Sequence, residues 1–472
     1  MNRRVAILLA PLALAACTVG PDYHPAPAPL PTRWQSASAA PLPAAPDWWR
    51  SFGDPALDAL ENQALAGNPD IGQALARIDH ARAEAGMARA DQLPAGELDA
   101  TVARSRQSLE AGLGQISHYV PSYERMANDA QLGLSARWEL DLAGGQRRER
   151  QAALAVLDGA RAGADAARLT VAGAVAETYV RLRIADARLA LLEERRALAA
   201  QRRAIMAERV GEGEAGRAAL EQADAALAGF DAAVPVLRAA GDSLRHRLAI
   251  LVGLPVGSSL PELTQPPALG LSGDGFSRSL PADPAAGLPA DILRRRPDLR
   301  LAEARAVAAN ARIGQALAEW WPKLSLSALA GFDTTRFATF GTDPSSVVTG
   351  AAGLRWRLLD FGRVKAGVDG ARGASREALE AWRGAVLQAG ADVEDAYTLL
   401  AARKAEAGAR AAALQSARSA YARAEVAANE GEISRDALAE QRLAQLAVED
   451  DAVAARGEAW LALASAFRAI GG

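Results

Sequence analysis

An internal duplication constrains this chain more than any other feature of its sequence. Separated segments of the first half match segments of the second half at two constant offsets. At 228 positions the matches are Asn68-Pro69-Asp70 with Arg296-Pro297-Asp298 and Leu93-Pro94 with Trp321-Pro322; at 218 positions they are Glu177-Thr178-Tyr179 with Asp395-Ala396-Tyr397 and Gly213-Glu214 with Gly431-Glu432. Because separated matches share each offset, the sequence predicts two structural repeats.

Each repeat is predicted to contain a helix, two strands, a long helix, a glycine-containing turn and a return helix, in that order. The helices are expected at about 55–92, 146–209 and 217–252 in the first repeat and at about 289–321, 363–429 and 435–470 in the second. The expected parts of the chain are a signal peptide (1–16), a lipidated tether (17–54), repeat one (55–253), an equatorial linker rich in Gly, Pro and Ser (254–288) and repeat two (289–472).

The long helices decide the architecture that we expect. A helix of about 65 residues is roughly 100 Å long, and a helix of about 35 residues is roughly half that length. Two short helices stacked end to end therefore match one long helix. The chain is rich in alanine and only 5% aromatic, so its helices can pack closely along their length. This predicts a tall helical bundle rather than a compact enzyme.

Four segments alternate apolar and polar residues with the period of a β-strand. They are 98–106, which is the weakest, 130–138, 324–333 and 348–357. Each approaches the roughly 9 to 11 residues that a tilted strand needs to cross a bilayer. Trp138, Phe332 and Trp356 lie at strand ends, as aromatic side chains do at membrane interfaces.

Four strands cannot close a membrane barrel, and open sheet edges in lipid leave backbone groups without hydrogen bonds. Two chains would supply eight strands around an interior filled by side chains, whereas three would supply twelve strands and room for an aqueous passage. A trimeric channel follows if the barrel is a pore. A four-stranded sheet packed on soluble helices is the alternative interpretation of the same pattern.

Composition excludes several classes of function. The formal net charge of −3 argues against a nucleic-acid-binding surface. A single cysteine excludes an intramolecular disulfide and a zinc site built on several thiolates, and the four histidines are scattered. The sequence contains no recognisable catalytic triad, phosphate-binding loop or metal-binding spacing. We therefore expect neither an enzyme nor a cofactor, apart from covalently attached lipid.

The N-terminus reads as a secretion and lipidation signal. Arg3 and Arg4 precede an apolar stretch, Val5–Ala16, that is too short to span a membrane. It ends in Leu14-Ala15-Ala16-Cys17, which resembles a bacterial lipobox. The implied processing cleaves before Cys17, attaches diacylglycerol to its thiol and acylates its new amine. An ordinary signal peptide with a chance cysteine is the alternative.

Several motifs resemble the NodT-type lipoproteins of the TolC-like outer-membrane efflux family. They are Trp48–Pro55, Asn68–Asp70, Trp138–Leu142, Leu288–Asp298 and Ala308–Gly314. The resemblance implies a mixed α and β membrane protein, a homotrimer in which a twelve-stranded β-barrel with four strands per chain stands on a long periplasmic α-helical barrel. It also implies a periplasmic adaptor and an inner-membrane pump, usually of the resistance-nodulation-division type, as partners.

The resemblance further implies that the two helical turns form the periplasmic tip, where the adaptor docks. The matching positions are Arg209, Gly211, Gly213, Arg217 and Leu220 in the first turn and Gly431, Ser434, Arg435 and Leu438 in the second. The spacing of Glu432, Asp436 and Glu440 predicts that they share one helix face. In a trimer they could form rings of gate carboxylates that favour cations; a merely solvated surface is the alternative.

The patterns predict a channel, and the resemblance implies that it is the passive exit duct of a tripartite efflux pump in the bacterial outer membrane, which passes drugs or other small molecules to the outside. No nucleotide-binding motif is present, so the energy would come from the pump. The alternative function is a lipid-anchored periplasmic coiled-coil scaffold without a pore.

Overall fold

The computed structural model describes residues 18–36, 47–106, 108, 110, 115, 120 and 126–472. Its contacts divide the chain into two compact units. The first unit contains the segment ending at Ala26 together with Ile78–Gly159 and Ala302–Ala381. The second unit contains Pro27–Arg77, Ala160–Leu301 and Trp382–Gly472. The predicted Cys17 lipidation site lies outside the described residues.

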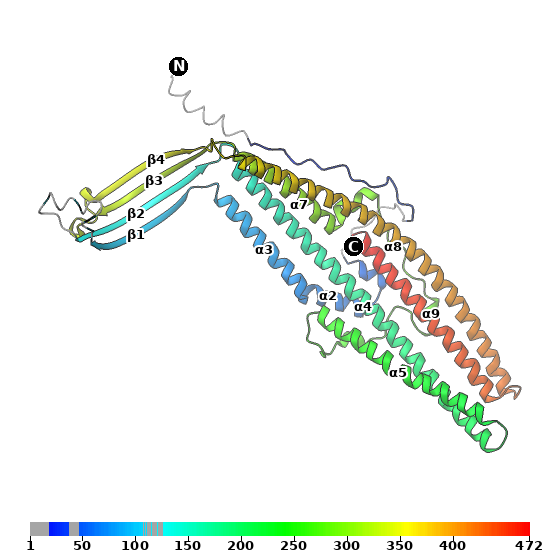
Figure 1. The fold of residues 1–472 in the computed structure, drawn as a ribbon. Helices are drawn as coiled ribbons and strands as arrows, with labels where there is room; N and C mark the ends of the chain where they lie inside the picture. The colour runs from blue at the N-terminus through cyan, green and yellow to red at the C-terminus, as the bar shows by residue number, and fades with distance from the viewer. Residues whose placement is uncertain are drawn as a thin grey trace. The chain divides into compact units, whose positions relative to one another are not determined.

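The first unit carries a four-stranded antiparallel sheet in the order β1-β2-β3-β4, drawn as four arrows side by side in Figure 1. The strands are β1 (Ala95–Arg106), β2 (Met126–Leu140), β3 (Lys323–Thr334) and β4 (Ser346–Arg355). All four predicted strands are therefore confirmed, although β1 and β2 each begin several residues before the predicted start. The alternation keeps one side-chain set on each face, because Leu98 lies opposite Leu134 and Leu134 lies opposite Ala330.

Helices make up most of the remaining chain. They are α2 (Pro55–Gly67), α3 (Pro69–Ala90), α4 (Gly145–Gly211), α5 (Arg217–Leu251), α6 (Ile292–Arg295), α7 (Pro297–Ala318), α8 (Arg363–Asn429) and α9 (Arg435–Ala469). Helices α4 and α8 each contain 67 residues, about 100 Å at 1.5 Å per residue. Among the described residues, no helix combines the length and apolarity needed to cross a membrane.

Prolines divide two segments that were each predicted to be one helix. The predicted helix 55–92 consists of α2 and α3, and the predicted helix 289–321 consists of a short 3-10 turn (Pro289–Asp291), α6 and α7. Both breaks lie at the residue before a proline, where Asn68 and Arg296 are extended with ψ of 127° and 116°. The proline ring clashes with a helical conformation of the preceding residue, so a helix ends there.

The two breaks are held by equivalent hydrogen bonds. The Asn68 side-chain amide donates to the carbonyl oxygen of Leu251 at 2.8 Å, and the Arg296 guanidinium donates to that of Ala469 at 3.2 Å. The acceptors are the last residues of α5 and α9 and are 218 positions apart. Each side chain thereby satisfies a carbonyl group that the end of its helix leaves free.

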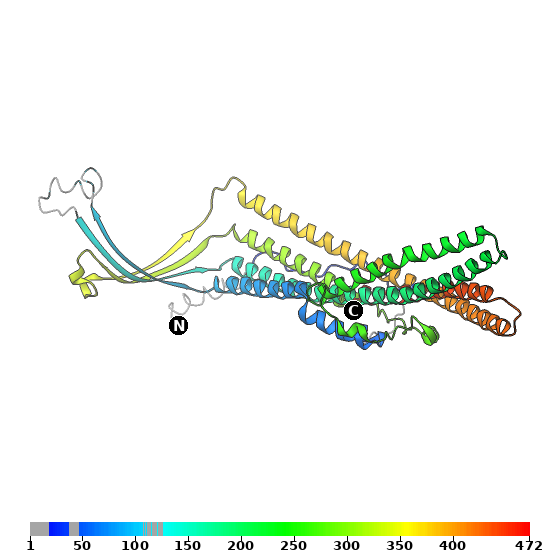
Figure 2. The same ribbon diagram turned by 90° about the horizontal axis from the view of Figure 1, so that it is seen from below.

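The core of the second unit gathers aromatic side chains around α9 and the C-terminus. Trp48, in a 3-10 helix (Trp48–Phe52), stacks on Phe467 with ring centroids 5.3 Å apart, and Phe52 lies 4.8 Å from Trp460. Both tryptophans are 2% exposed. The segment that was predicted to be a tether therefore ends in aromatic side chains that pack against α9. Figure 2 shows α9 beside α4 and α8.

The linker 254–288 is held through its backbone carbonyl groups. Arg183 donates to Leu263 and Gln265, and Arg456 donates to Leu269 and Arg278, with distances between 2.8 and 3.0 Å. Both arginine residues are almost completely buried. Since buried charges need hydrogen-bond partners, these contacts fix an irregular segment against helices that share a unit with it.

Candidate functional site

Both helical turns of the second unit have the same backbone geometry. The N–H of Glu214 donates to the carbonyl oxygen of Arg209 at 2.8 Å, and the N–H of Glu432 donates to that of Ala427 at 2.8 Å. A second hydrogen bond closes each turn. The N–H of Gly213 donates to the carbonyl oxygen of Val210, and the N–H of Gly431 donates to that of Ala428. This is the Schellman motif, in which glycine adopts the left-handed conformation; φ is 77° at Gly213 and 80° at Gly431.

The two turns differ in how the return helix begins. In the second turn the Ser434 hydroxyl oxygen accepts from the N–H of Ala437 and caps α9. In the first turn Gly216 occupies the equivalent position and α5 has no side-chain cap. Exposed or half-buried side chains of the predicted docking residues surround both turns: Arg209, Arg217 and Leu220 in the first, and Arg435 and Leu438 in the second.

Two of the three predicted gate acids lie on either side of one arginine. Arg202 of α4 contacts Asp436 through two hydrogen bonds, Nε to Oδ1 at 2.8 Å and Nη2 to Oδ2 at 3.3 Å. Glu440 lies 3.7 Å from the same guanidinium group. The hydrogen bonds that Arg202 donates to Asp436 raise the pKa of Arg202 above its ordinary value, although partial burial opposes this. The pair joins the first repeat to the second near the two turns.

The prediction that Glu432 shares a helix face with Asp436 and Glu440 is wrong. Helix α9 begins at Arg435, so Glu432 lies within the turn and the i, i+4 rule does not apply to it. Its side chain is exposed. Arg202 was missed by sequence reasoning, because only its proximity to Asp436 in three dimensions distinguishes it from the other arginines of α4.

The segment that follows the predicted lipidation site is bound within the first unit. Arg148 of α4 donates to the carbonyl oxygens of Val19 and Gly20 at 3.1 and 2.9 Å and to the Asp22 carboxylate at 2.9 Å. Gly314 of α7 makes room for this segment, since a Cβ there would lie 2.7 Å from the Val19 carbonyl oxygen. Residues 19–22 therefore have a defined binding site beside the beginning of α4.

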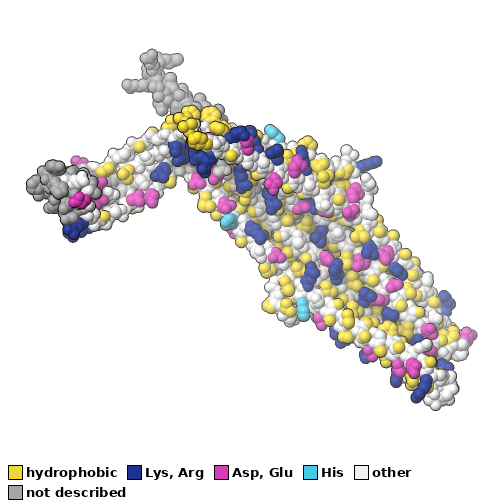
Figure 3. Space-filling view, in the orientation of Figure 1, with side chains coloured by type: hydrophobic (Ala, Val, Ile, Leu, Met, Phe, Trp, Pro, Cys, Tyr) yellow, Lys and Arg dark blue, Asp and Glu magenta, His cyan; other side chains and the backbone are white. Residues whose placement is uncertain are grey.

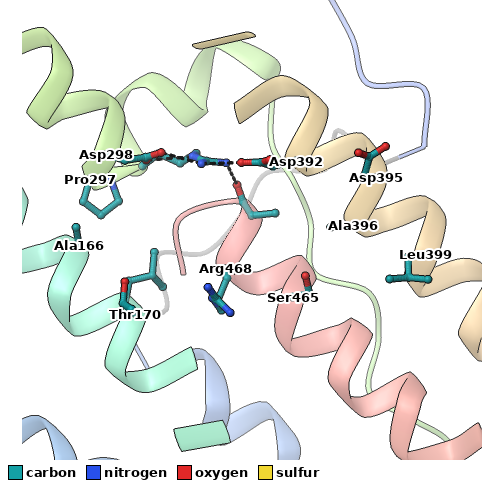
Figure 4. A pocket seen from close by; sticks show the side chains of 13 residues that line it. Ala166, Thr170, Pro297, Asp298, Asp392, Asp395, Ala396, Leu399, Ser465 and Arg468 are labelled. Carbon is teal, nitrogen blue, oxygen red and sulfur yellow. Dashed lines mark hydrogen bonds and ion pairs between the residues drawn. The ribbon is translucent and has the colours of Figure 1, made fainter. Parts of the chain in front are cut away.

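A hollow of about 480 Å³ with both polar and apolar lining lies within the second unit, lined by α4, α7, α8 and α9 (Figure 4). At its edge Arg296 contacts Asp298 at 2.8 Å and Asp392 at 2.9 Å. Burial opposes the charge of Arg296, but these two carboxylates raise its pKa above the ordinary value. Arg296, the third arginine of the run 294–296, thus belongs to an ion-pair network.

No arrangement for catalysis emerges from these contacts. Over the described part of the chain, no group of three or more His, Cys, Asp or Glu side chains could hold a metal ion. On the face shown in Figure 3, basic and acidic side chains are interspersed along the helices. The features that the sequence singled out are two glycine-containing turns, acidic side chains beside the second turn and a sheet whose outer strands each have one partner among the described residues.

A four-stranded sheet combined with two long helical hairpins defines the class of outer-membrane channel proteins. The solved structure of the outer-membrane channel OprN has this fold; it is 28% identical, covers 97% of this chain and 99% of its own, and superposes with a TM-score of 0.77. The chain belongs to the outer membrane efflux protein family, whose model matches residues 60–254 and 288–472.

Two relatives are similar to this chain over most of its length. The pyoverdine export outer membrane protein OpmQ of Pseudomonas putida is 32% identical over 398 residues, which cover 84% of this chain and 82% of that protein. Nodulation protein T of Rhizobium leguminosarum bv. trifolii is 30% identical over 394 residues, covering 82% and 80%. These matches confirm the family that the sequence motifs indicated, and they favour a transport protein over an enzyme.

Proposed function

We propose that this chain forms the outer-membrane exit duct of a tripartite efflux system. Three copies would join their sheets into a twelve-stranded barrel and their helices into a periplasmic tube. Small molecules would cross it passively. The name of the relative OpmQ, a pyoverdine export protein, makes pyoverdine-like molecules one candidate cargo, beside drugs.

One observation carries this proposal: a sheet with an apolar face and two unpaired edges. The outermost strands β1 and β4 are exposed along almost their whole length, and the order β1-β2-β3-β4 leaves each of them with one partner. In lipid an unpaired edge would leave backbone N–H and C=O groups without hydrogen bonds, at several kcal/mol each. Only closure through further copies removes both edges.

The two turns would dock a periplasmic adaptor, and an inner-membrane pump would supply the energy. Their glycine-closed geometry presents short ends, with Arg209 half-buried and with Arg217 and Arg435 exposed. A duct of this kind opens only if the adaptor binds the open state more tightly than the closed state. The Arg202–Asp436 ion pair would contribute to the stability of the closed state. Adaptor binding would have to offset that contribution to open the duct.

Lipid on Cys17 would complete the assembly. Residues 19–22 are bound beside the beginning of α4. Because residue 17 is only two positions before residue 19, its lipid would be attached close to that site. We expect radioactive palmitate to label the protein and Cys17→Ser to abolish labelling. Labelling that survives this substitution would exclude Cys17 as the lipidation site.

Conductance measurements test the proposed duct. We expect the purified protein to run as a heat-resistant trimer and to conduct ions in planar bilayers. A folded monomer without conductance would contradict the duct and favour the alternative, a lipid-anchored coiled-coil scaffold. Tagged protein isolated from cells should also bring with it an adaptor and a pump, whose identity would define the system.

A further inference from the structure

The two free edges of the sheet belong to strands from different repeats. Strand β1 comes from the first repeat and β4 from the second, and neither pairs on its outer side with any described residue. The edges lie three strand spacings apart, about 14 Å at 4.8 Å per spacing. They therefore cannot pair with each other within one chain.

The sequence offsets reproduce the register of the sheet. Ala95 of β1 pairs with Arg137 of β2. The residue 228 positions after Ala95 is Lys323, and the residue 218 positions after Arg137 is Arg355. These two residues are partners in the β3–β4 ladder. The two hairpins thus obey one rule, and the β2–β3 ladder joins them into one sheet.

The same rule gives a register for the free edges. Within the chain, Ala136 of β2 pairs with Ala328 of β3. Moving Ala136 forward by 218 positions gives Leu354 on β4, and moving Ala328 back by 228 gives Ala100 on β1. If a second copy continues the pattern, Leu354 lies opposite Ala100 of that copy.

We propose that β4 of each copy pairs antiparallel with β1 of the next copy in the register that places Leu354 opposite Ala100. The inference rests on the proposed trimer and specifies its seam. A heterologous contact of this kind closes into a ring when the rotation between copies allows it. Every strand then has two neighbours.

Charge supports this register independently of the duplication. In this register Arg355 would lie opposite Asp99 of the next copy, and Arg357, two residues beyond the end of β4 and 3.4 Å from Glu319 of its own chain, would lie opposite Glu97. All four side chains belong to exposed positions. Opposite charges that face each other across strands stabilise the pair. A slip of two residues in either direction retains only one of the two pairs.

The apolar face supports the same register. Leu354 lies opposite Ala100, and on the same face Ala352 meets Val102 and Trp356 meets Leu98. A slip of one residue would place Arg355 on this apolar face, because side chains alternate along a strand. Lipid would penalise a charged side chain there. The seam would thus be apolar on one face and ion-paired on the other.

Cysteine cross-linking tests the register. The variant carrying Leu354→Cys and Ala100→Cys should form inter-chain disulfides on mild oxidation, giving covalent dimers and trimers on denaturing gels. The matched controls pair Leu354→Cys with Val102→Cys or with Leu98→Cys. These diagonal positions lie about 7 to 8 Å apart in our register, beyond the reach of an unstrained disulfide. The single-cysteine variants show the background.

The possible outcomes distinguish a failure of the proposed register from a failure of the proposed trimer. Cross-links in the first variant only would support the register. Cross-links in a diagonal control instead would overturn the register while leaving the trimer intact. If no variant cross-links and the native mass is that of a monomer, the proposed trimer itself fails. If none cross-links although the protein is trimeric, the β4–β1 seam is wrong.

Charge reversal supplies a second measurement. Arg355→Glu and Asp99→Arg should each lower the temperature at which the trimer dissociates, and the double variant should recover most of the loss. A double variant that is no more stable than the two single variants would contradict the Arg355–Asp99 contact. Any pair at Arg357 and Glu97 remains in all of these variants.

Discussion

The two strand-to-helix junctions of the first unit have related sequences but different surroundings. In the β2–α4 junction, Asp141 accepts hydrogen bonds from the N–H groups of Gln146 and Arg147. The flanking Leu140 and Leu142 are half-buried. In the β4–α8 junction, the Asp360 carboxylate also accepts two backbone hydrogen bonds at the start of α8, but from the nearer N–H groups of Gly362 and Val364. Its leucines, however, are exposed: 75% for Leu358 and 85% for Leu359.

The difference arises from what lies next to each junction. Gly145 meets Ala318 of α7, so closely that an added Cβ would lie 2.9 Å from it, and Gly144 meets Thr18. The second junction has no such cover among the described residues, and Phe361 is fully exposed. Each junction therefore places an aspartate cap before its long helix, whereas the burial of its apolar side chains depends on a neighbour that the described residues provide only at the first junction.

The largest expected effect comes from making the exposed junction polar. If the α3 end of another copy covers it, as α7 covers the first junction, Leu359→Glu should reduce trimer formation at least tenfold. Burial of a leucine is worth about 1.5 to 3 kcal/mol, and each trimer has three such contacts. The amount of heat-resistant trimer after refolding measures this effect.

The conservative variant Leu359→Met is the control, because it keeps the volume and apolarity of the side chain. It should form trimers as the unaltered protein does. Normal trimer formation by Leu359→Glu would mean that the second junction faces solvent in the assembly and that its difference from the first has no structural consequence.

A second difference between the repeats is a buried acid. Glu61 of α2 is fully buried, and position 289 at the matching offset is a proline. Burial, reinforced by Asp58, raises the pKa of Glu61 to about 9. The group is therefore protonated in the folded state at neutral pH but ionised in the unfolded state. Its effect on stability must depend on pH.

The sign follows from proton linkage. Since the folded state holds the proton up to about pH 9, stability should fall as the pH rises from about 4.5 toward 9. Glu61→Gln removes this cost and should stabilise the protein by about 3 kcal/mol at pH 7. Thermal unfolding at pH 5 and pH 8 measures the change. Glu84→Gln, at an exposed position of α3, should change little, and equal slopes for both variants would exclude Glu61 as the cause.

The smallest expected effect concerns the two turns. Asp436 in the second turn has Ala218 as its counterpart in the first, so only the second turn supplies an ion pair to Arg202. A pair of this exposure is worth up to about 1 kcal/mol, roughly fivefold in an opening equilibrium. Asp436→Ala should therefore increase leak conductance or alter cation block in planar bilayers. Glu214→Ala in the first turn is the control. Unchanged conductance and selectivity in Asp436→Ala would exclude a gating role.

Sequence reasoning succeeded where local chemistry decides structure. The alternation of Ala130–Trp138 predicted β2, and the glycines at 213 and 431 predicted turns that both take the left-handed conformation. It failed at Asn68 and Arg296, because helical periodicity on both sides concealed breaks that the following prolines impose. It also placed Glu432 on a helix that begins three residues later.

The contacts of distant arginines were beyond sequence reasoning. Arg148, Arg183, Arg202 and Arg456 are four of many arginines in amphipathic helices, and their roles depend on which backbone or carboxylate groups lie near them in space. Such partners lie between 80 and 234 positions away in the sequence. Periodicity shows which face of a helix an arginine occupies, but not which group meets that face.

The sequence by itself determined the order of the elements, the lengths of the long helices and the motifs of the family, because propensity, alternation and turn chemistry are local. The tertiary structure alone decided the strand register, the binding of residues 19–22 and the contrast between the two junctions. These depend on packing between segments far apart in the chain, where burial and hydrogen-bond satisfaction select among arrangements that local preferences leave equal.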